Sequence, residues 1–455
     1  MDTDGSNGMR LTSETDGEGD TAELTGGPVS ESGRIEALDV ARGFAVLGIL
    51  LMNVWAFALP KEAFEYPVMV KSLGHGVMET WAVTVVLFAG TQRGLFSLLF
   101  GAGAMMIQTR LAKRVSDQGI RKIYYRRIFI LIVIGLIDGF IFMWPSDILF
   151  VYGLCGLLLF PANKLRTGAL LLLTAVVFIV PIAKRSGDLQ EFQATRQAYE
   201  VALTKQASGV ILDEADQLAL VTWPEELQDA RPGLDDERIR QTTEIMARGS
   251  FRDVFINQAK GTIVVQTIVN YHFYFLDALG MMLLGMVIFR AGILTGRAST
   301  RMLAVMLVLG VAIGLPISIW KASSIIVTDF APIAQARTWV VYDVGRVGMV
   351  IGYLAAVLLF CRAAWGNWLK QLLAPVGRMA LTNYLTQSIL GALIFYSFGL
   401  GLYGKLAGYQ LYLTIIPIWI LQIIWSRIWL EHFHYGPFEW VWRSLTYMQW
   451  QTLHR

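Results

Sequence analysis

The sequence predicts an all-α, polytopic membrane protein with about ten transmembrane helices and a helical polar insert. Of its 455 residues, 55% are hydrophobic and only 16% are charged, whereas soluble chains are usually charged at about a quarter of their positions. Mean hydropathy is +0.51. Residues 43–59, 128–144 and 302–320 contain a single charged side chain, Asp138. About 20 apolar residues cross the hydrocarbon core of a bilayer, so a lipid bilayer is the expected environment of the chain.

Ten apolar runs are long enough to be read as spans. They are residues 40–59, 78–107, 128–144, 147–161, 168–183, 272–290, 302–320, 340–361, 379–398 and 411–430. The second run is the longest, and "GTQRG" (90–94) interrupts it with two glycines and an arginine. Glycine is unfavourable inside a helix, so this span is expected to be kinked or broken there.

The positive loops orient the bundle. Residues 109–127 carry seven basic side chains against one acidic side chain, and short loops rich in Lys and Arg stay in the cytoplasm. Basic residues in the loops around 164–166, 297–301 and 362–370 fall on the same side of a ten-span count. We therefore expect a protein of the plasma (inner) membrane with both termini in the cytoplasm.

Composition divides the chain into five segments. Residues 1–33 hold eight acidic residues and one arginine, which predicts a disordered acidic tail. Residues 34–183 form an N-terminal bundle of five spans, and 184–262 form an extracytoplasmic polar insert with helix-forming composition. Residues 263–430 form a second bundle of five spans, and 431–455 form an interfacial C-terminal segment.

Charged residues at the mouth of the first span have two readings. Asp39 and Arg42 lie three positions apart, so they share one helical face. They form either a local ion pair that anchors the span, or a site in which Arg42 holds a phosphate or carboxylate with its planar guanidinium. Asn53 lies about three turns deeper, where an interhelical hydrogen bond is the ordinary role.

Charges deeper in the bundle need partners, because a charge in hydrocarbon costs at least about 2.5 kcal/mol. Arg93 lies near the middle of the second span, and its partner is expected to be Asp138, Asp277 or Asp343. Asp138 lies about 9 Å from the outer end of its span; it is either salt-bridged or suited to acid–base chemistry. Asp343 and Arg346 lie one turn apart and are expected to pair with each other.

Three further residues belong to the candidate site. His75 lies in the outer loop between the first two spans, where a solvated histidine is the ordinary role. Arg378 leads into the ninth span and suits positive-inside anchoring. Asn383 follows in a polar stripe that provides either hydrogen bonds between helices or the lining of a substrate path. Asp147, after "WPS", is explained by capping of the fourth span.

Six blocks carry a family resemblance. They are "LDVARGFAVLGILLMNV" (38–54), "RGLFSLLFGAGAMM" (93–106), "YYRRIFILIVIGLIDGFIF" (124–142), "DILFVYGLCGLLL" (147–159), "PVGRMALTNYLTQSIL" (375–390) and "GPFEWVWRSLT" (436–446). Together they resemble the YeiB-like family of bacterial membrane proteins, whose C-terminal half is a domain of unknown function. The chain departs from the family at Asp138, because the usual motif there is "GLIH" and not "GLID".

The first block also resembles the opening of a wider group of membrane acyltransferases, which includes the heparan-alpha-glucosaminide N-acetyltransferases. That resemblance implies an acyl-CoA-type donor on the cytoplasmic side and a small-molecule, glycan or lipid acceptor on the far side. Arg42 would then meet the phosphates of the donor, and Asp138 and His75 would be catalytic. Substrate contacts would come from Asp39, Arg42, Asn53, Arg93, Asp277, Asp343, Arg378 and Asn383.

A transporter or channel is the alternative, with the buried charges lining a path for a small solute. The sequence has no zinc-ligand spacing, so no metal is expected. Its basic residues are spread among short loops, so a nucleic acid is not an expected partner. The sequence leaves open whether the chain forms a homo-oligomer.

The ten-span count predicts the side on which each loop lies. A reporter that is active only outside the cytoplasm should be active when fused at residue 220, in the polar insert, and inactive when fused at residue 117. Activity assays of the two fusions in whole cells measure this. Equal activity at both positions would contradict the count, and the long second span would be the first place to correct it.

Overall fold

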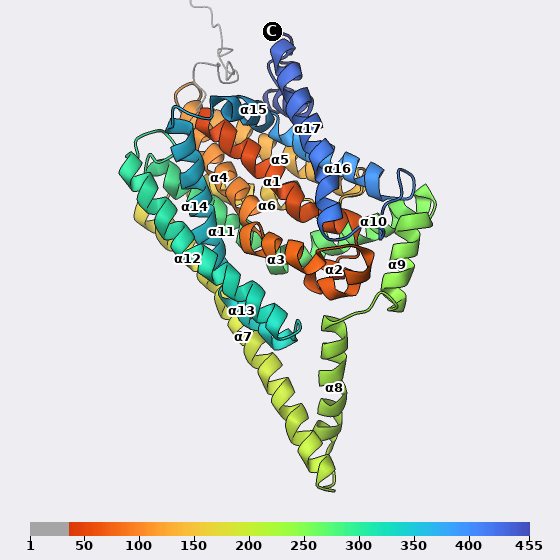
Figure 1. The fold of residues 1–455 in the computed structure, drawn as a ribbon. Helices are drawn as coiled ribbons and strands as arrows, with labels where there is room; N and C mark the ends of the chain where they lie inside the picture. Colours follow the sequence, from red (N-terminus) through yellow and green to blue (C-terminus); the bar gives the residue numbers. More distant parts are fainter. Residues whose placement is uncertain (1–35) are drawn as a thin grey trace, which may run out of the picture.

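The computed structural model describes residues 36–455, so the expected acidic tail lies outside the described residues. Residues 36–455 form helices without any β-strand, apart from one isolated bridge between Phe433 and His454. The fold is therefore all-α, as expected. The helices stack into a bundle from which one long hairpin projects (Figure 1).

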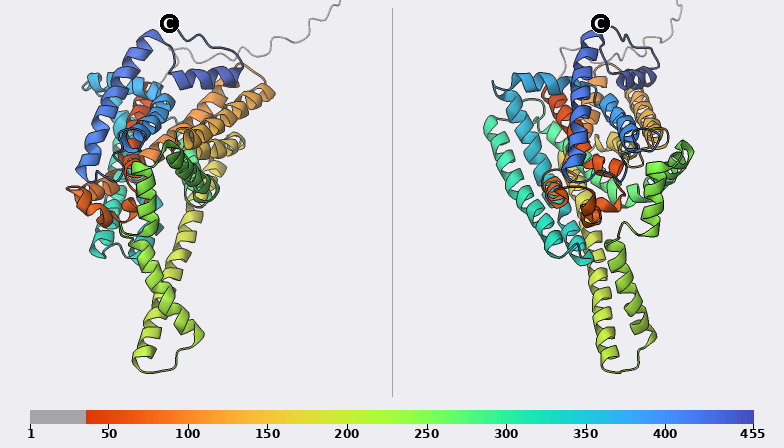
Figure 2. Two further views of the ribbon diagram at one scale, coloured as in Figure 1. Left: turned by 90° about the vertical axis from the view of Figure 1, so that its right-hand side faces the viewer. Right: turned by 45° about the vertical axis from the view of Figure 1, so that its right-hand side comes forward.

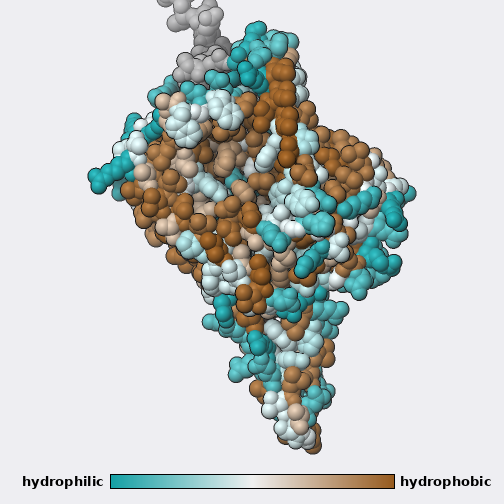
Figure 3. Space-filling view, in the orientation of Figure 1, coloured by the Kyte–Doolittle hydropathy of each residue, from teal (hydrophilic) through white to brown (hydrophobic). Residues whose placement is uncertain are grey.

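Within residues 36–455, seven helical stretches are long and apolar enough to cross a membrane. They are Glu36–Ala58 (α1), Val77–Leu111 (α3 and α4), Thr167–Ala207 (α7), Phe251–Arg290 (α10 to α11), Thr300–Val327 (α12), Tyr342–Arg362 (α14) and Tyr409–His432 (α17). Apolar residues cover most of the bundle in Figure 3, while polar ones gather at its upper end and beside the hairpin. These features confirm a polytopic membrane protein.

The other three expected spans are also helices. They are Asp117–Phe140 (α5), Leu149–Ala162 (α6) and Ala380–Phe395 (α16). Charged residues in the first half of α5 lower its hydropathy, and α6 and α16 have only 14 and 16 residues. Both short helices bury most of one face against the bundle, so protein contacts and not only lipid surround them.

The expected interruption of the second span is confirmed. The helix α3 (Val77–Leu87) ends before Gly90, and α4 (Thr91–Leu111) begins directly after it. Gly90 has φ of 69°, a left-handed conformation that glycine adopts most readily. A Cβ atom there would also overlap the Tyr342 hydroxyl. The break places Arg93 in the first turn of α4, inside the bundle.

The helix α7 is a single rod of 41 residues. The expected boundary between residues 183 and 184 therefore falls inside one continuous helix. The helix α8 (Glu214–Ala230) returns beside α7 (Figure 2), and Lys205 Nζ lies 2.8 Å from Asp216 Oδ1 across this hairpin. After α9 (Glu237–Arg248), α10 (Phe251–Val264) leads through the π-helix η3 (Val265–Tyr274) into α11 (Phe275–Arg290). Single π turns inside helices often mark functional sites.

Short helices close the two ends of the bundle. The helices α15 (Asn367–Arg378) and α18 (Pro437–Tyr447) lie at the end where α4 gives way to α5, which we call the basic end after the arginines and lysines of residues 109–127. Pro437 takes the first position of α18, after Gly436, where its fixed φ suits a helix start. The helices α2 (Glu62–Glu65) and α13 (Pro332–Val340), with η2 (Pro67–Leu73), lie toward the other end, which we call the hairpin end (Figure 1).

Glycines bring α4 and α11 into backbone contact. A Cβ on Gly101 would overlap the carbonyl oxygen of Met282, and one on Gly285 would overlap that of Leu98. Lipid gives apolar helices little reason to associate, so close packing at small residues supplies much of the attraction between them. The same packing sets the register between Arg93 on α4 and Asp277 on α11.

Substitution of Gly101 by alanine should therefore push α4 away from α11. We expect Gly101→Ala to destabilise the protein by about 1–3 kcal/mol, the usual range for overpacking. Gly187→Ala is the matched control, because nothing lies within 4 Å of its Cβ position. Thermal unfolding in detergent should show a lower Tm for the first variant and an unchanged or higher Tm for the second. Equal Tm values would mean that α4 and α11 are not in close contact.

Candidate functional site

Asp277, at the start of α11, joins two arginines from different helices. Its Oδ2 lies 3.1 Å from Arg93 Nη2 on α4, and its Oδ1 lies 2.6 Å from Arg346 Nη1 on α14. The side chains of Asp277 and Arg346 are 3% and 1% exposed. Of the three partners considered for Arg93, the structure therefore selects Asp277.

The ion pairs continue through a second carboxylate. Asp343 Oδ1 lies 2.8 Å from Arg346 Nη2, which is the expected pair within α14. Asp343 Oδ2 lies 2.6 Å from Arg185 Nη1 on α7. Sequence reasoning missed Arg185 because the polar insert was taken to begin at 184. Its position directly after an apolar run was the available signal.

Aromatic rings hold these arginines in place. Arg93 lies over the ring of Tyr274 at 4.5 Å, and Arg346 lies 5.3 Å from the ring of Tyr342. A cation above an aromatic face is attracted by the negative face of the ring. The Tyr152 hydroxyl donates to the Arg93 carbonyl oxygen at 3.1 Å. The result is a network of ion pairs across α4, α7, α11 and α14.

A second polar cluster centres on two carboxyl groups. Asp138, near the end of α5, is fully buried and accepts a hydrogen bond from Ser388 Oγ on α16 at 3.2 Å. Asp147 Oδ2 accepts from the Phe150 backbone N–H at 2.8 Å, so Asp147 caps α6 as its sequence position suggested. The Tyr384 hydroxyl, from α16, lies beside both groups and accepts from the Ile148 N–H.

The remaining oxygen of each carboxyl group is buried. Asp138 Oδ1 and Asp147 Oδ1 are both buried, and neither receives a donor from residues 36–455. The two carboxyl groups are within hydrogen-bonding reach of one another. Two carboxylates in one buried cluster repel each other when both carry a charge. Asp138 thus has a carboxyl neighbour and no ion pair with a cation among the described residues.

Polar side chains of α10 and η3 line the other side of α5. Thr262 Oγ1 donates to the Gly139 carbonyl at 2.9 Å. Gln266 Nε2 and Asn270 Oδ1 are buried without a partner in the part of the chain that the structure describes. The hairpin-end half of the bundle therefore contains more buried polar atoms than its own hydrogen bonds satisfy.

The structure does not bring His75 to Asp138. His75 is exposed, its ring lies 6.4 Å from that of Tyr409, and its carbonyl accepts from the Tyr409 N–H. Asp138 contacts α16 and the start of α6 instead. The two residues predicted to be catalytic, His75 and Asp138, therefore contact different parts of the structure and do not form one site.

Asn383 and Asn53 also differ in their contacts. Asn383 Nδ2 donates to Ser426 Oγ on α17 at 2.9 Å and to the Val376 carbonyl at 3.1 Å, which is the expected kind of interhelical contact. Asn53 is half-buried and makes no side-chain hydrogen bond within residues 36–455. Arg378 ends α15, one turn before Asn383.

Arginines from four helices gather at the basic end. Arg42 pairs with Asp39 at 3.3 Å, and its side chain is 29% exposed. Arg42 lies within electrostatic range of Arg110 on α4 and Arg127 on α5, and Arg127 is within range of Arg443 on α18. We call these four residues the arginine cluster. Like charges brought together in this way attract anions.

Neighbouring side chains fix the cluster in place. Arg127 lies over the Trp442 ring at 3.5 Å. Glu439, one turn before Arg443, accepts from the Leu381 and Thr382 N–H groups at 2.7 and 3.1 Å. Its carboxylate therefore caps the start of α16, and burial raises the pKa of the Glu439 carboxyl.

A groove lies next to Arg110, between the end of α4, the start of α5 and the end of α6. Its volume is about 630 Å³, within the size range of small-molecule sites. Its lining includes Gln108, Thr109, Asn163, the cations Arg121 and Lys164, and the carboxylate Asp117. A cationic, polar groove beside the arginine cluster suits an anionic ligand with several hydrogen-bonding groups.

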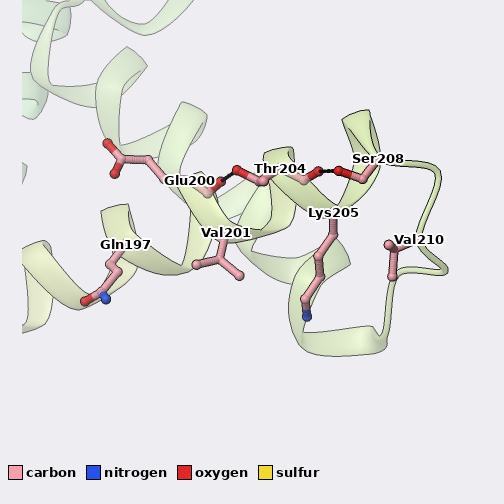
Figure 4. Close-up of a pocket in the computed structure, with 7 residues that line it drawn as sticks. All are labelled: Gln197, Glu200, Val201, Thr204, Lys205, Ser208 and Val210. Atoms are coloured by element: carbon pink, nitrogen blue, oxygen red, sulfur yellow. Dashed lines mark hydrogen bonds between the residues drawn. The ribbon is translucent and has the colours of Figure 1, made fainter.

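A second hollow, of about 370 Å³, lies at the tip of the hairpin (Figure 4). Its Thr204 and Ser208 hydroxyls donate to backbone carbonyls one turn earlier in α7. It is formed by the end of one helix and the loop that follows, so no polar groups from different helices meet in it. Residues 36–455 also contain no group of three His, Cys, Asp or Glu side chains placed to hold a metal ion.

Comparisons with known proteins agree with the family resemblance. Residues 288–449 match the family described as "Protein of unknown function (DUF418)". The chain is 29% identical over 429 residues to "Uncharacterized protein YeiB" of Escherichia coli, with 90% of this chain and 95% of YeiB covered. It is also 29% identical over 447 residues to "Uncharacterized protein YxaH" of Bacillus subtilis, with 94% and 97% covered. No solved structure matches the chain.

The ion-pair network makes Asp277 a critical residue for stability. Asp277→Asn would leave Arg93 without a carboxylate and Arg346 with only one. Breaking a buried pair costs about 3–5 kcal/mol, so Tm in detergent should fall sharply. Glu200→Gln is the control, since Glu200 and Arg196 form an exposed pair of a kind worth about 0–1 kcal/mol. A wild-type Tm for Asp277→Asn would show that water reaches the two arginines.

Proposed function

The chain is a YeiB-like, multi-pass membrane protein, and we propose that it is a membrane acyltransferase that moves an acyl group from an acyl-CoA-type donor to an acceptor across the bilayer. The observation that carries this proposal is the arginine cluster of Arg42, Arg110, Arg127 and Arg443, which four helices bring together at one end of the bundle. The positive-inside rule favours the plasma membrane orientation that puts this end in the cytoplasm.

The arginine cluster suits the donor's phosphates. Guanidinium groups bind phosphates through paired, charge-assisted hydrogen bonds, and Arg42 keeps a partly exposed side chain for this purpose. The adjoining groove has room for the nucleotide part, with Gln108, Asn163 and Arg121 as polar contacts. When bound, an acyl-CoA supplies an activated thioester.

The helix α5 links the two halves of the proposed site. Arg127 and Asp138 lie eleven residues apart on it, which corresponds to about 16 Å at 1.5 Å per residue. An extended arm such as the pantetheine of a coenzyme A bridges a separation of this kind. Phosphates held at Arg127 would therefore leave the thioester near Asp138.

The carboxyl pair would handle the proton. The ionised member of Asp138 and Asp147 accepts the proton of an acceptor hydroxyl as its oxygen attacks the thioester carbonyl. The new C–O bond forms, the C–S bond breaks, and the protonated carboxyl returns a proton to the leaving thiolate. Ser388 and Tyr384 orient the pair. His75, on the surface at the hairpin end, would meet the acceptor, which is a small molecule, a glycan or a lipid.

Transport of a small solute is the second candidate. The observation that favours it is the network from Arg93 to Arg185, because buried charges in a membrane often mark substrate or ion paths. The two functions differ in a measurable way, since only the acyltransferase consumes an acyl donor.

Donor binding tests the arginine cluster directly. Purified protein should bind acyl-CoA species of one chain-length class, and Arg42→Ala should weaken that binding by about tenfold or more, since a charged hydrogen bond is worth about 1.5–3 kcal/mol. Arg301→Ala, which removes an exposed arginine at the start of α12, is the matched control and should bind like the wild type. Isothermal titration in detergent measures both.

Transfer activity tests the carboxyl pair in the same preparation. Asp138→Asn should fold and bind the donor, because the amide keeps the shape of the carboxyl group, yet it should lose acyl transfer. Binding of no acyl-CoA, combined with a solute flux that depends on Asp138, would overturn the acyltransferase proposal in favour of transport.

A further inference from the structure

Cations outnumber carboxylates at the outer edge of the ion-pair network. Asp277 and Asp343 use all four of their oxygens on Arg93, Arg346 and Arg185. Lys321, on α12, adds a further positive charge. No carboxylate in residues 36–455 lies within ion-pair distance of Lys321. Two other carboxylates at this end already have cationic partners. Asp188 lies 3.9 Å from Lys184, and Asp329 lies 3.7 Å from Arg231.

Two aromatic rings hold Lys321 beside Arg185. Lys321 Nζ lies 4.6 Å from the Trp339 ring and 4.8 Å from the Tyr342 ring. Arg185 Cζ lies 5.5 Å from each of the same rings. Two cations therefore lie against the same pair of aromatic rings. Asp343 compensates the charge of Arg185, but no carboxylate among the described residues compensates the charge of Lys321.

The depth of these residues matches a membrane interface. Lys321 lies 21 residues after the start of α12 and Arg185 lies 18 residues after the start of α7, or about 31 and 27 Å along their helices. The hydrocarbon core is about 30 Å thick. Trp339 is 39% exposed, whereas Lys321 is largely buried, with only part of its surface open, so the edge of this pair faces outward. The helices α7, α12 and α13 lie side by side here (Figure 1).

We propose that Lys321, Arg185 and Trp339 form a binding site for a phosphate-bearing anionic headgroup at the hairpin end of the bundle. Lysine binds phosphate as a point charge, and arginine binds it through several donors. Asp343 and the Trp339 carbonyl occupy only Arg185 Nη1, so its other N–H groups are available to a ligand. Trp339 gives the acyl or glycerol part of a lipid an apolar surface at headgroup depth. This inference does not depend on acyl transfer.

The headgroup has two potential sources: a phospholipid of the surrounding leaflet or a soluble phosphate compound. Both present the same charge, so the two cations recognise them alike. A lipid also contacts Trp339 and the apolar face of α12. A soluble phosphate is bound by electrostatic attraction alone, and salt weakens that attraction.

The experiment titrates the full-length protein in detergent with phosphatidylglycerol, phosphatidylcholine and inorganic phosphate, and follows Tm and bound lipid by native mass spectrometry. Phosphatidylglycerol should raise Tm saturably. Lys321→Gln should weaken this binding by about tenfold, since a charged contact is worth about 1.5–3 kcal/mol. Lys321→Arg should retain it. Lys71→Gln removes an exposed lysine of η2 and should behave like the wild type.

Competition identifies the source of the headgroup. Displacement of phosphatidylglycerol by millimolar inorganic phosphate supports a soluble phosphate ligand, and saturable binding that phosphate cannot displace supports a lipid. Equal binding of phosphatidylcholine, or wild-type binding by a folded Lys321→Gln protein, overturns the proposal.

Discussion

The carboxylate of Asp277 is the contact on which the hairpin-end half of the bundle depends. It binds one arginine of α4 and one of α14, in a medium where an unpaired charge costs several kilocalories per mole. Apolar surface alone does not hold helices together in lipid. The backbone contact between α4 and α11 at Gly101 therefore matters for charge as well as for packing, because it brings Arg93 opposite Asp277.

The two ends of the bundle differ in the charged side chains that they contain. At the basic end, arginines of four helices converge with Asp39 as the carboxylate paired to Arg42. In the other half, Asp277 and Asp343 are buried and paired to arginines, whereas Asp138 and Asp147 are buried in one cluster and each has an oxygen without a donor among residues 36–455. The helix α5 contributes to both sets of charges, with Arg127 near its start and Asp138 near its end. The helix therefore joins the arginine cluster at one end of the bundle to the buried carboxyl groups of the other half.

Sequence reasoning succeeded where the determinant was local. All ten apolar runs are helical in the structure, and seven of the helical stretches in residues 36–455 are long enough to span a membrane. Gly90 indicates the break in the second run, and spacing indicates the Asp343–Arg346 pair. It left three partners open for Arg93, because the choice depends on which helices pack together. The position of Asp147 predicts a cap, which is correct for one oxygen, whereas the other oxygen is buried without a donor among residues 36–455. The composition changes at residue 184 without any residue that stops a helix, so the boundary between apolar run and polar insert lies inside α7.

The long sequence separations within the network constrain how the protein is made. Arg93 precedes Asp277 by 184 residues, and Arg185 precedes Asp343 by 158. At about 5–20 residues per second, a ribosome needs roughly 10 to 40 s to supply the carboxylate that Arg93 requires. During that interval the first five spans carry cations whose counter-charges do not yet exist. The ion pairs of the N-terminal half are therefore completed only after α11 and α14 have been synthesised, which makes the formation of the network a late step in the assembly of the protein.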